Sequence, residues 1–432
     1  MAELFDLKET EERVVLIAVS TGDGDDAEAS LKELAELVKT AGAVTVDKVI
    51  QNREKVHPGT YLGKGKIEEV KDLVWELDAT GVVCDDELSP AQLKNLEAAL
   101  DTKVMDRTMV ILDIFASRAH TREGKIQVEL AQLKYRAARL VGMRASLSRL
   151  GGGIGTRGPG EKKLEVDRRL IHERIGQLKA ELEDVKRHRE VTRQQREQGC
   201  AVSAAIVGYT NAGKSTLLNH LTDADILAED KLFATLDPTT RSFTLPGDQQ
   251  ILLTDTVGFI RKLPHHLIEA FKSTLEEAKY SDIILHVVDC SNPQMDMQMH
   301  VVRETLKDLE IVDKTVVTVF NKTDRLRALV ESGEAGPLAQ LPRDFSADYQ
   351  VRISAKTGEG LDELCGILEQ IIRSRRVHLE KVYPYSQAGR IQTIRKYGQL
   401  LGGVHGGRDR GGGVCAGRAV WKIVCGLGDR DV

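Results

Sequence analysis

Residues 1–107 alternate short apolar runs with segments of helical spacing. The run VVLIAVS (14–20) is apolar enough for a buried strand, and the helix-spaced segment ASLKELAELVKTAG (29–42) follows it. Later segments repeat this order of strand and helix. The predicted helix SPAQLKNLEAAL (89–100) begins with a Ser cap and a Pro. Such alternation predicts an N-terminal α/β domain over 1–107, with a parallel sheet flanked by helices. Its expected strands are the runs at 14–20, 44–51, 81–86 and 103–108.

Residues 108–200 carry a different pattern, in which apolar side chains recur at spacings of three and four. The first stripe consists of Ile126, Leu130, Leu133, Ala137 and Leu140, and the second of Ile171, Ile175, Leu178, Leu182 and Val185. Each stripe predicts one long amphipathic helix. Two such helices joined by a short turn fold back on each other. We therefore expect an antiparallel helical hairpin that links two domains.

The tip of this hairpin is glycine-rich. GGGIGTRGPGE (151–161) contains the spacing G-x-G-x-x-G at Gly153, Gly155 and Gly158. In a dinucleotide-binding domain this spacing follows a strand, whereas here it follows a helix, so we exclude that function. Between residues 134 and 196, Lys and Arg outnumber Asp and Glu by about two to one, and Arg157 lies in the tip. Two interpretations remain: a probe that contacts RNA, and a solvated hairpin with a plain turn.

One loop of the N-terminal domain is also basic. YLGKGK (61–66) precedes a predicted helix. A contact with phosphate or RNA and a simple basic turn are both compatible with this segment.

Composition narrows the class of protein. The chain has 432 residues, of which 41% are apolar and 29% charged, ordinary values for a globular protein of several domains. No run approaches about 20 apolar residues, and the acidic start lacks an apolar signal segment, so we expect neither a membrane span nor secretion. The six cysteines lie far apart, which argues against a zinc site or disulfides and suits a reducing cytoplasm. The net charge of -5 gives no global nucleic-acid signal.

The most informative motif is a phosphate-binding loop. VSAAIV (202–207) reads as a strand, Gly208-x-x-x-x-Gly213-Lys214-Ser215 follows, and a helix comes next. Backbone N–H groups of such a loop and the helix N-terminus bind the β-phosphate. The Lys214 ammonium reaches the β- and γ-phosphates, and the Ser215 hydroxyl is a Mg²⁺ ligand.

Later motifs complete a site for GTP. In ILLTDTVGF, Asp255 ends an apolar strand, where its carboxylate can hold Mg²⁺ through a water, and the Gly258 N–H can reach the γ-phosphate. In NKTD, the Asp324 carboxylate can accept hydrogen bonds from N1–H and the exocyclic amine of guanine, a pair of donors that adenine lacks. In SAKTG, a backbone N–H can meet guanine O6 and Lys356 can pack over the base. The order of the motifs predicts a doubly wound GTPase domain over 201–374.

The switch that senses the γ-phosphate must lie between the phosphate loop and Asp255. FATLDPTTR (233–241) occupies that place, and both Thr235 and Thr239 offer a second hydroxyl for Mg²⁺. In Ras-like proteins a Gln after D-x-x-G orients the attacking water. Here Phe259 stands at that position and has no polar group to do so. We therefore expect slow intrinsic hydrolysis, with a partner that completes the site.

Taken together, these segments resemble the HflX family, within the Obg–HflX group of translational GTPases. The resemblance covers the α/β domain, GGGIGTRGPGE, GYTNAGKST, FATLDPTTR, DTVGFIRKLPHHLIEAFKSTLEE, NKTD and SAKTG. It implies a GTPase that binds the large ribosomal subunit and its rRNA, and that splits stalled or idle ribosomes in a GTP-dependent way under stress. We expect the protein to be a cytoplasmic monomer. It also places the switch hydroxyl on Thr235. By the same likeness, the expected rRNA contacts are Gly153, Gly155, Arg157 and Gly158.

The resemblance and the motifs give one set of site residues. The catalytic residues are Lys214, Thr235 and Gly258, and the Mg²⁺ ligands are Ser215, Thr235 and, through a water, Asp255. The expected GTP-binding residues are Gly208, Tyr209, Thr210, Asn211, Ala212, Gly213, Lys214, Ser215, Phe233, Ala234, Thr235, Leu236, Asp237, Asp255, Thr256, Val257, Gly258, Asn321, Lys322, Thr323, Asp324, Ser354, Ala355 and Lys356.

The C-terminal region, 375–432, departs from the family. HflX proteins usually end in a small domain whose strands alternate apolar residues, and the resemblance stops at about residue 401. From Gly402 the chain is rich in Gly, Arg and Cys, with little alternation. A disordered basic tail is one hypothesis, and a shifted reading frame in the source gene is another.

Two alternative functions stay open at this point. A large-subunit assembly factor would bind free large subunits and leave assembled ribosomes intact. A regulatory switch with a protein effector would have no RNA partner, and neutralising its hairpin charge would have no effect.

Overall fold

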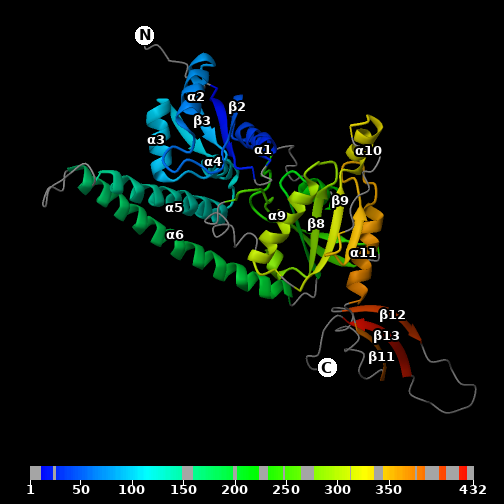
Figure 1. Cartoon of the computed structure of the whole chain (residues 1–432). Helices are drawn as coiled ribbons and strands as arrows, with labels where there is room; N and C mark the ends of the chain where they lie inside the picture. Colours follow the sequence, from blue (N-terminus) through cyan, green and yellow to red (C-terminus); the bar gives the residue numbers. More distant parts are fainter. Residues whose placement is uncertain are drawn as a thin grey trace, which may run out of the picture.

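The computed structural model describes residues 11–22, 26–147, 159–197, 202–222, 232–246, 249–263, 277–311, 313–334, 344–374, 377–384, 398–404 and 418–425. These form an N-terminal α/β unit, a long helical arm, a second α/β unit and a small C-terminal sheet (Figure 1). The α/β fold class predicted from the alternating pattern is confirmed. The glycine-rich tip, with Gly153, Gly155, Arg157 and Gly158, lies outside the described residues.

The N-terminal sheet has four parallel strands in the order β2-β1-β3-β4. They are β1 (Arg13–Ser20), β2 (Val44–Asn52), β3 (Gly81–Cys84) and β4 (Lys103–Asp106). The helices are α1 (Ala27–Thr40), α2 (Lys64–Glu76), α3 (Pro90–Leu100) and α4 (Arg107–Arg118). The predicted cap of α3 is present: the Ser89 hydroxyl accepts from the Gln92 N–H, and the Gln92 side chain accepts in turn from the Ser89 N–H.

Both faces of this sheet are covered. Successive side chains of a strand point to opposite faces, so Val15 and Ile17 pack with α2 and α3, while Val14 and Leu16 pack with α1 and α4. The domain is therefore a three-layer α/β unit.

The start of α4 differs from the prediction. The run at 103–108 was expected to be a strand, but the strand ends at Asp106 and the helix begins at Arg107. The Asp106 carboxylate accepts a hydrogen bond from the Met109 N–H at 3.0 Å and so caps the helix. The apolar side chains that follow extend the core instead of the sheet.

The predicted hairpin is confirmed as two long packed helices. α5 (Arg122–Leu147) and α6 (Pro159–Glu197) run side by side as an arm (Figure 1). Their stripes meet as expected, because Ile126, Leu130 and Leu178 are buried together with Leu133, Ile175 and Leu182 packed around them. A bidentate pair between Arg174 and Glu129, at 2.8 and 3.0 Å, fixes the register from the outside.

The second α/β unit is a six-stranded sheet in the order β10-β9-β8-β5-β7-β6, parallel except for β6. Its strands are β5 (Val202–Gly208), β6 (Thr239–Thr244), β7 (Gln250–Asp255), β8 (Ile283–Asp289), β9 (Thr315–Asn321) and β10 (Tyr349–Arg352). Its helices are α7 (Lys214–Thr222), α9 (Met295–Asp308), α10 (Thr323–Glu331) and α11 (Leu361–Ser374). α7 and α11 cover one face and α9 the other, as in a doubly wound sheet.

A buried cluster of charges joins the two α/β units. Arg107 binds Glu33 at 2.6 Å and Asp85 at 2.9 Å within the N-terminal unit. From the second unit, the Lys262 ammonium lies 2.6 Å from Asp85, and the Tyr209 hydroxyl donates to Glu33 at 2.9 Å. Arg107 and Asp85 are almost completely buried. The contact of Lys262 with Asp85 therefore lies inside a defined interface between the two units.

The C-terminal sheet contains three antiparallel strands in the order β11-β13-β12. They are β11 (Val377–Pro384), β12 (Gly398–Val404) and β13 (Arg418–Cys425). The hypothesis of a disordered tail is therefore wrong for 418–425, because this segment pairs with both other strands. Within the described part of the chain, no helix is long and apolar enough to cross a membrane.

Candidate nucleotide-binding site

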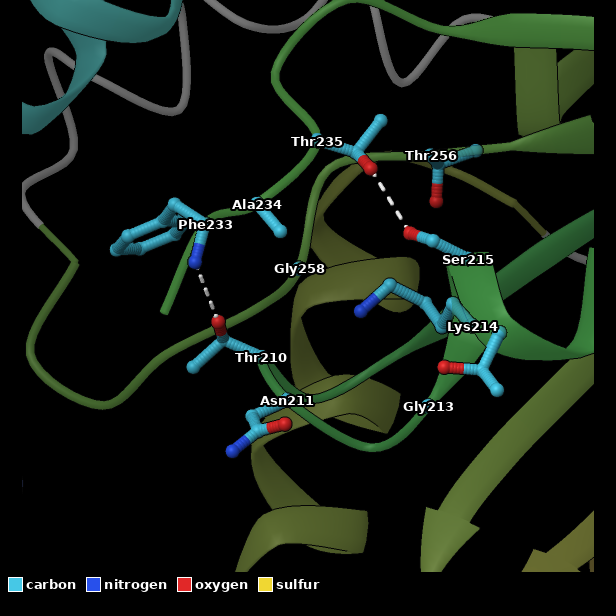
Figure 2. Close-up of a pocket in the computed structure, with 11 residues that line it drawn as sticks. Thr210, Asn211, Gly213, Lys214, Ser215, Phe233, Ala234, Thr235, Thr256 and Gly258 are labelled. Carbon is cyan, nitrogen blue, oxygen red and sulfur yellow. Dashed lines mark hydrogen bonds between the residues drawn. The ribbon is translucent and has the colours of Figure 1, made fainter. Parts of the chain in front are cut away.

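The predicted GTP motifs converge at one edge of the second sheet. The phosphate loop follows β5, Asp255 ends β7, and the segments NKTD and SAKTG follow β9 and β10. In an open parallel sheet the carboxyl ends of the strands form the ligand crevice. Residues far apart in the sequence therefore meet in one place. Figure 2 shows the pocket at the centre of this edge.

The phosphate loop wraps tightly against the guanine motif. Gly213 has φ +95°, in the region that favours glycine, and a Cβ there would lie 2.3 Å from Asn321 Nδ2. That Asn321 amide donates to the Ala212 carbonyl at 2.9 Å and accepts from the Ala355 N–H at 2.9 Å. Asn321 thus holds the phosphate loop and the SAKTG segment together.

The Lys214 side chain lies inside the loop. Its ammonium donates to the Tyr209 carbonyl at 2.9 Å, and the side chain is buried. Burial lowers the pKa of Lys214 to about 8, against the raising effect of Asp255. The ammonium points into the pocket (Figure 2), so an incoming phosphate would meet a desolvated cation.

Three oxygen side chains meet where Mg²⁺ was predicted. Ser215 Oγ and Thr235 Oγ1 lie 2.9 Å apart, and Asp255 Oδ2 accepts from them at 2.7 and 3.2 Å. Adjacent ligands of an octahedral Mg²⁺ ion lie about 2.9 Å apart, so the hydroxyl pair has the required spacing. Asp255 Oδ1 is buried without a hydrogen-bond partner, and burial raises the pKa of this carboxyl. The side chains therefore fit a divalent cation.

The structure distinguishes the two candidate switch threonines. Thr235 lines the pocket beside Ser215 (Figure 2). Thr239 begins β6 and is paired in the sheet opposite Asp255. Only the first of these two hydroxyls faces the predicted cation.

Aromatic packing holds the switch segment in this position. The Phe233 N–H donates to Thr210 Oγ1 at 2.8 Å, and Phe233 has φ +54°. Its ring packs edge-on against Phe115 of α4, with 4.7 Å between centroids. The segment therefore lies between the phosphate loop and the N-terminal unit.

Phe259 occupies a structural position. Its ring is buried, its N–H donates to the Gly208 carbonyl, and its carbonyl accepts from the Thr210 N–H at 2.7 Å. These bonds tie the segment after Gly258 to the phosphate loop. As predicted, the side chain offers no polar group that orients a water.

The guanine end of the site is pre-arranged. Asp324 Oδ1 accepts from the Ser354 hydroxyl at 2.7 Å. The Lys322 ammonium donates to the Asn211 carbonyl at 2.8 Å and pairs with Asp289 at 2.8 Å. Lys356 is exposed. The SAKTG loop thus fixes the Asp324 carboxylate, and the phosphate loop and Asp289 fix Lys322.

The remaining predicted residues lie in or beneath the site, except Asp237, which is bound elsewhere. The Thr256 hydroxyl donates to the Ile206 carbonyl, and the Thr323 hydroxyl to the Ile353 carbonyl. Ala212, Leu236 and Val257 are buried in the core. Asp237 points away from the pocket, since its carboxylate accepts from Thr121 and His120 at the start of α5.

Sequence reasoning missed two residues of this region. Thr216 lines the pocket directly after Ser215. Asp289 positions Lys322 from the end of β8. A carboxylate at the end of an apolar run, VVD, was the available signal for Asp289, but it belongs to no motif.

Comparison with known families follows the same division of the chain. A family model described as "GTP-binding GTPase N-terminal" matches residues 28–116, and one described as "GTP-binding GTPase Middle Region" matches 118–196. A third, described as "50S ribosome-binding GTPase", matches 203–322.

Similar proteins cover nearly the whole chain. "GTPase HflX" of Lacrimispora saccharolytica is 78% identical over 401 residues, which are 93% of this chain and 92% of that protein. "GTPase HflX" of Escherichia coli is 41% identical over 392 residues, 90% of this chain and 89% of that protein. A solved GTP-binding protein from Sulfolobus solfataricus in complex with GDP is 23% identical, with a TM-score of 0.43, and the match covers 83% of this chain and 98% of that one.

Proposed function

This chain belongs to the HflX family of GTPases, and on that premise we propose that it binds the large ribosomal subunit and splits stalled or idle ribosomes in a GTP-dependent way under stress. The observation that carries the proposal is that the GTP motifs converge at one sheet edge, in a domain joined to a long basic hairpin. The family model over 203–322 is described as a ribosome-binding GTPase, which supports the large subunit as partner. We place the protein in the cytoplasm as a monomer.

Hydrolysis uses residues that already stand in position. We propose that Ser215 and Thr235 bind Mg²⁺ directly and that Asp255 holds it through a water. When bound, Mg²⁺ neutralises charge on the β- and γ-phosphates. The Lys214 ammonium would stabilise the same oxygens, and the Gly258 N–H would bind the γ-phosphate.

Phe259 stands at the position where Ras-like proteins place the Gln that orients the attacking water. Phe259 is buried against the phosphate loop and cannot orient the water. We therefore propose a slow intrinsic rate that the ribosome raises by completing the site. Groups supplied in trans accelerate other GTPases by about 10³–10⁵-fold.

The hairpin supplies the contact with RNA. α5 and α6 form an arm whose exposed surface carries Arg169 and Lys179. We propose that its tip, with Gly153, Gly155, Arg157 and Gly158, contacts rRNA. Of the proposed domain limits at 107, 200 and 374, the first two bound the linker region that contains the arm, and the third ends the GTPase domain. The switch that is ordered by GTP favours the ribosome-bound state, and hydrolysis releases the protein from the ribosome.

The first test measures GTP hydrolysis by the purified protein, alone and with large or small ribosomal subunits. We expect large subunits to raise the rate at least about tenfold, small subunits to have little effect, and Lys214→Ala to abolish the activity. No stimulation by large subunits would contradict the proposal and favour a switch with a protein effector. Stimulation by free large subunits without loss of assembled ribosomes would instead favour an assembly factor.

A further inference from the structure

The switch segment contacts the start of helix α5 through Asp237. The Asp237 carboxylate accepts hydrogen bonds from the backbone N–H groups of His120 and Thr121, at 3.0 and 2.8 Å, and from the Thr121 hydroxyl at 2.5 Å. Thr121 in turn accepts from the Gly124 N–H at 3.0 Å, so it caps the first turn of α5. Asp237 therefore extends the cap with a negative charge at the positive end of the helix.

These contacts lie close to the predicted nucleotide site. Only Leu236, which is buried, separates Asp237 from Thr235, whose hydroxyl stands beside Ser215 at the predicted Mg²⁺ position. With one fixed residue between them, the two side chains cannot move independently. Withdrawal of Thr235 from the pocket would pull Asp237 from the helix.

The helix is shaped to receive this carboxylate. Gly124 is buried, and a Cβ there would lie 2.4 Å from Asp237 Oδ1 and 3.3 Å from its Cγ. Glycine is otherwise unfavourable inside a helix, by about 1 kcal/mol relative to alanine. The close approach of Asp237 is the contact that requires a glycine at this position.

We propose that Thr121 and Gly124, outside the GTPase domain, are positioning residues for the switch: they hold Asp237 when Thr235 closes on GTP and Mg²⁺, and release it after hydrolysis. The inference rests on the proposed Mg²⁺ role of Thr235 and is independent of ribosome splitting. α5 is 26 residues long, so a change at its first turn acts on an arm about 39 Å in length. The contact thus couples the nucleotide to the hairpin tip.

Coupling between two sites is reciprocal. If GTP strengthens the contact between Asp237 and α5, then weakening that contact must weaken the binding of GTP relative to GDP. The experiment therefore measures the affinities of full-length protein for GDP and for the non-hydrolysable analogue GMPPNP, both with Mg²⁺ and without ribosomes.

The decisive variant is Gly124→Ala, with Gly176→Ala as its matched control. Both replace a helical glycine of the hairpin, but a Cβ at Gly176 would have no atom within 4 Å, whereas one at Gly124 displaces the Asp237 carboxylate. We expect Gly124→Ala to weaken GMPPNP binding at least about fivefold and to leave GDP binding unchanged. Gly176→Ala should change neither.

A second pair of variants covers the case in which Gly124→Ala fails to fold. Thr121→Val removes the hydroxyl and should lower GMPPNP affinity as Gly124→Ala does, whereas Thr121→Ser retains it and should behave as the wild type. Hydrogen exchange of the amides of His120 and Thr121 separates this role from a merely structural one, because a merely structural contact would protect them equally with either nucleotide. These amides should be protected with GMPPNP and exchange at least about tenfold faster with GDP.

The proposal is overturned if Thr121→Val keeps the wild-type ratio of GMPPNP to GDP affinity, or if protection of the two amides does not depend on the nucleotide. Since no ribosome is present, that failure would leave ribosome splitting untouched. If GMPPNP with Mg²⁺ bound wild-type protein no more tightly than GDP did, and Thr235→Ala changed neither affinity, the assigned role of Thr235 would fail as well.

Discussion

The buried ammonium of Lys214 makes nucleotide binding depend on pH. Burial lowers its pKa to about 8, so below that pH the free protein already carries the charge that phosphate needs. Above it, binding must take up a proton, and affinity should fall by up to about tenfold per pH unit. We expect GDP affinity, measured by calorimetry between about pH 7 and 9, to show this decline. Lys214→Ala should bind weakly with no such slope, and a flat wild-type profile would contradict the assignment.

The choice of guanine depends on the acceptor character of Asp324. Its carboxylate is fixed by the Ser354 hydroxyl at 2.7 Å. Asp324→Asn keeps one acceptor oxygen for the N1–H of guanine but replaces the other with an NH2 donor, which faces the exocyclic amine donor and cannot pair with it. We expect GTP affinity to fall about 10²-fold or more, while xanthosine triphosphate, which carries a carbonyl in place of the amine, gains affinity. Equal loss for both nucleotides, in a competition assay, would speak against this role.

At this scale the sequence predicted most of the site, because motif residues are read by type and spacing. Ser215 and Asp255 were found in this way, and both lie together with Thr235. The choice between Thr235 and Thr239 came from resemblance alone, and spacing did not supply it. The true contacts of Asp237 were not predictable, since its partners lie more than a hundred positions earlier in the chain.

Among the elements, the hairpin depends on a narrow apolar seam. Leu178 is 1% exposed, whereas Leu170 on the same helix is 54% exposed. We expect Leu178→Ala to destabilise the pairing of α5 and α6 by about 2–4 kcal/mol, because it leaves a cavity. Leu170→Ala should stay within about 0.5 kcal/mol. Hydrogen exchange of amides in both helices measures the difference, and equal effects of the two variants would show that the seam is placed wrongly.

Helical periodicity explains why this hairpin was predictable, since stripes at spacings of three and four define one face. The start of α4 was harder to predict. Its apolar run resembles a strand, and its start depends on the capping carboxylate of Asp106. That carboxylate also accepts from Tyr135 and Arg139 of α5. Long-range partners of this kind leave no local pattern. The strand β13 was obscured by the glycine-rich sequence around it.

The interface between the α/β units is a property of the whole molecule. Lys262 reaches Asp85 and Asp86, each at 2.6 Å, from 177 and 176 positions away. No motif marks these residues, so sequence reasoning could not pair them. Lys279 forms a comparable pair with Glu310 at 3.1 Å, but on the surface. The two lysines therefore provide a matched comparison.

We expect Lys262→Ala to lower the free energy of unfolding by about 1–3 kcal/mol, because buried Asp85 loses one of its two cations. Lys279→Ala should cost less than about 1 kcal/mol, as exposed pairs do. Denaturant titration of the full chain measures both. If the surface variant is the more damaging one, the cluster does not hold the units together.

Splitting would convert assembled ribosomes into free subunits. The most direct measurement is sucrose-gradient sedimentation of bacterial ribosomes after incubation with the protein and GTP, GMPPNP or GDP. The proposed function predicts that assembled ribosomes are lost to free subunits with GTP and with GMPPNP, that GDP has little effect, and that Lys214→Ala is inactive. Assembled ribosomes that persist with GTP, in samples where large subunits still stimulate hydrolysis, would contradict splitting as the function of this protein.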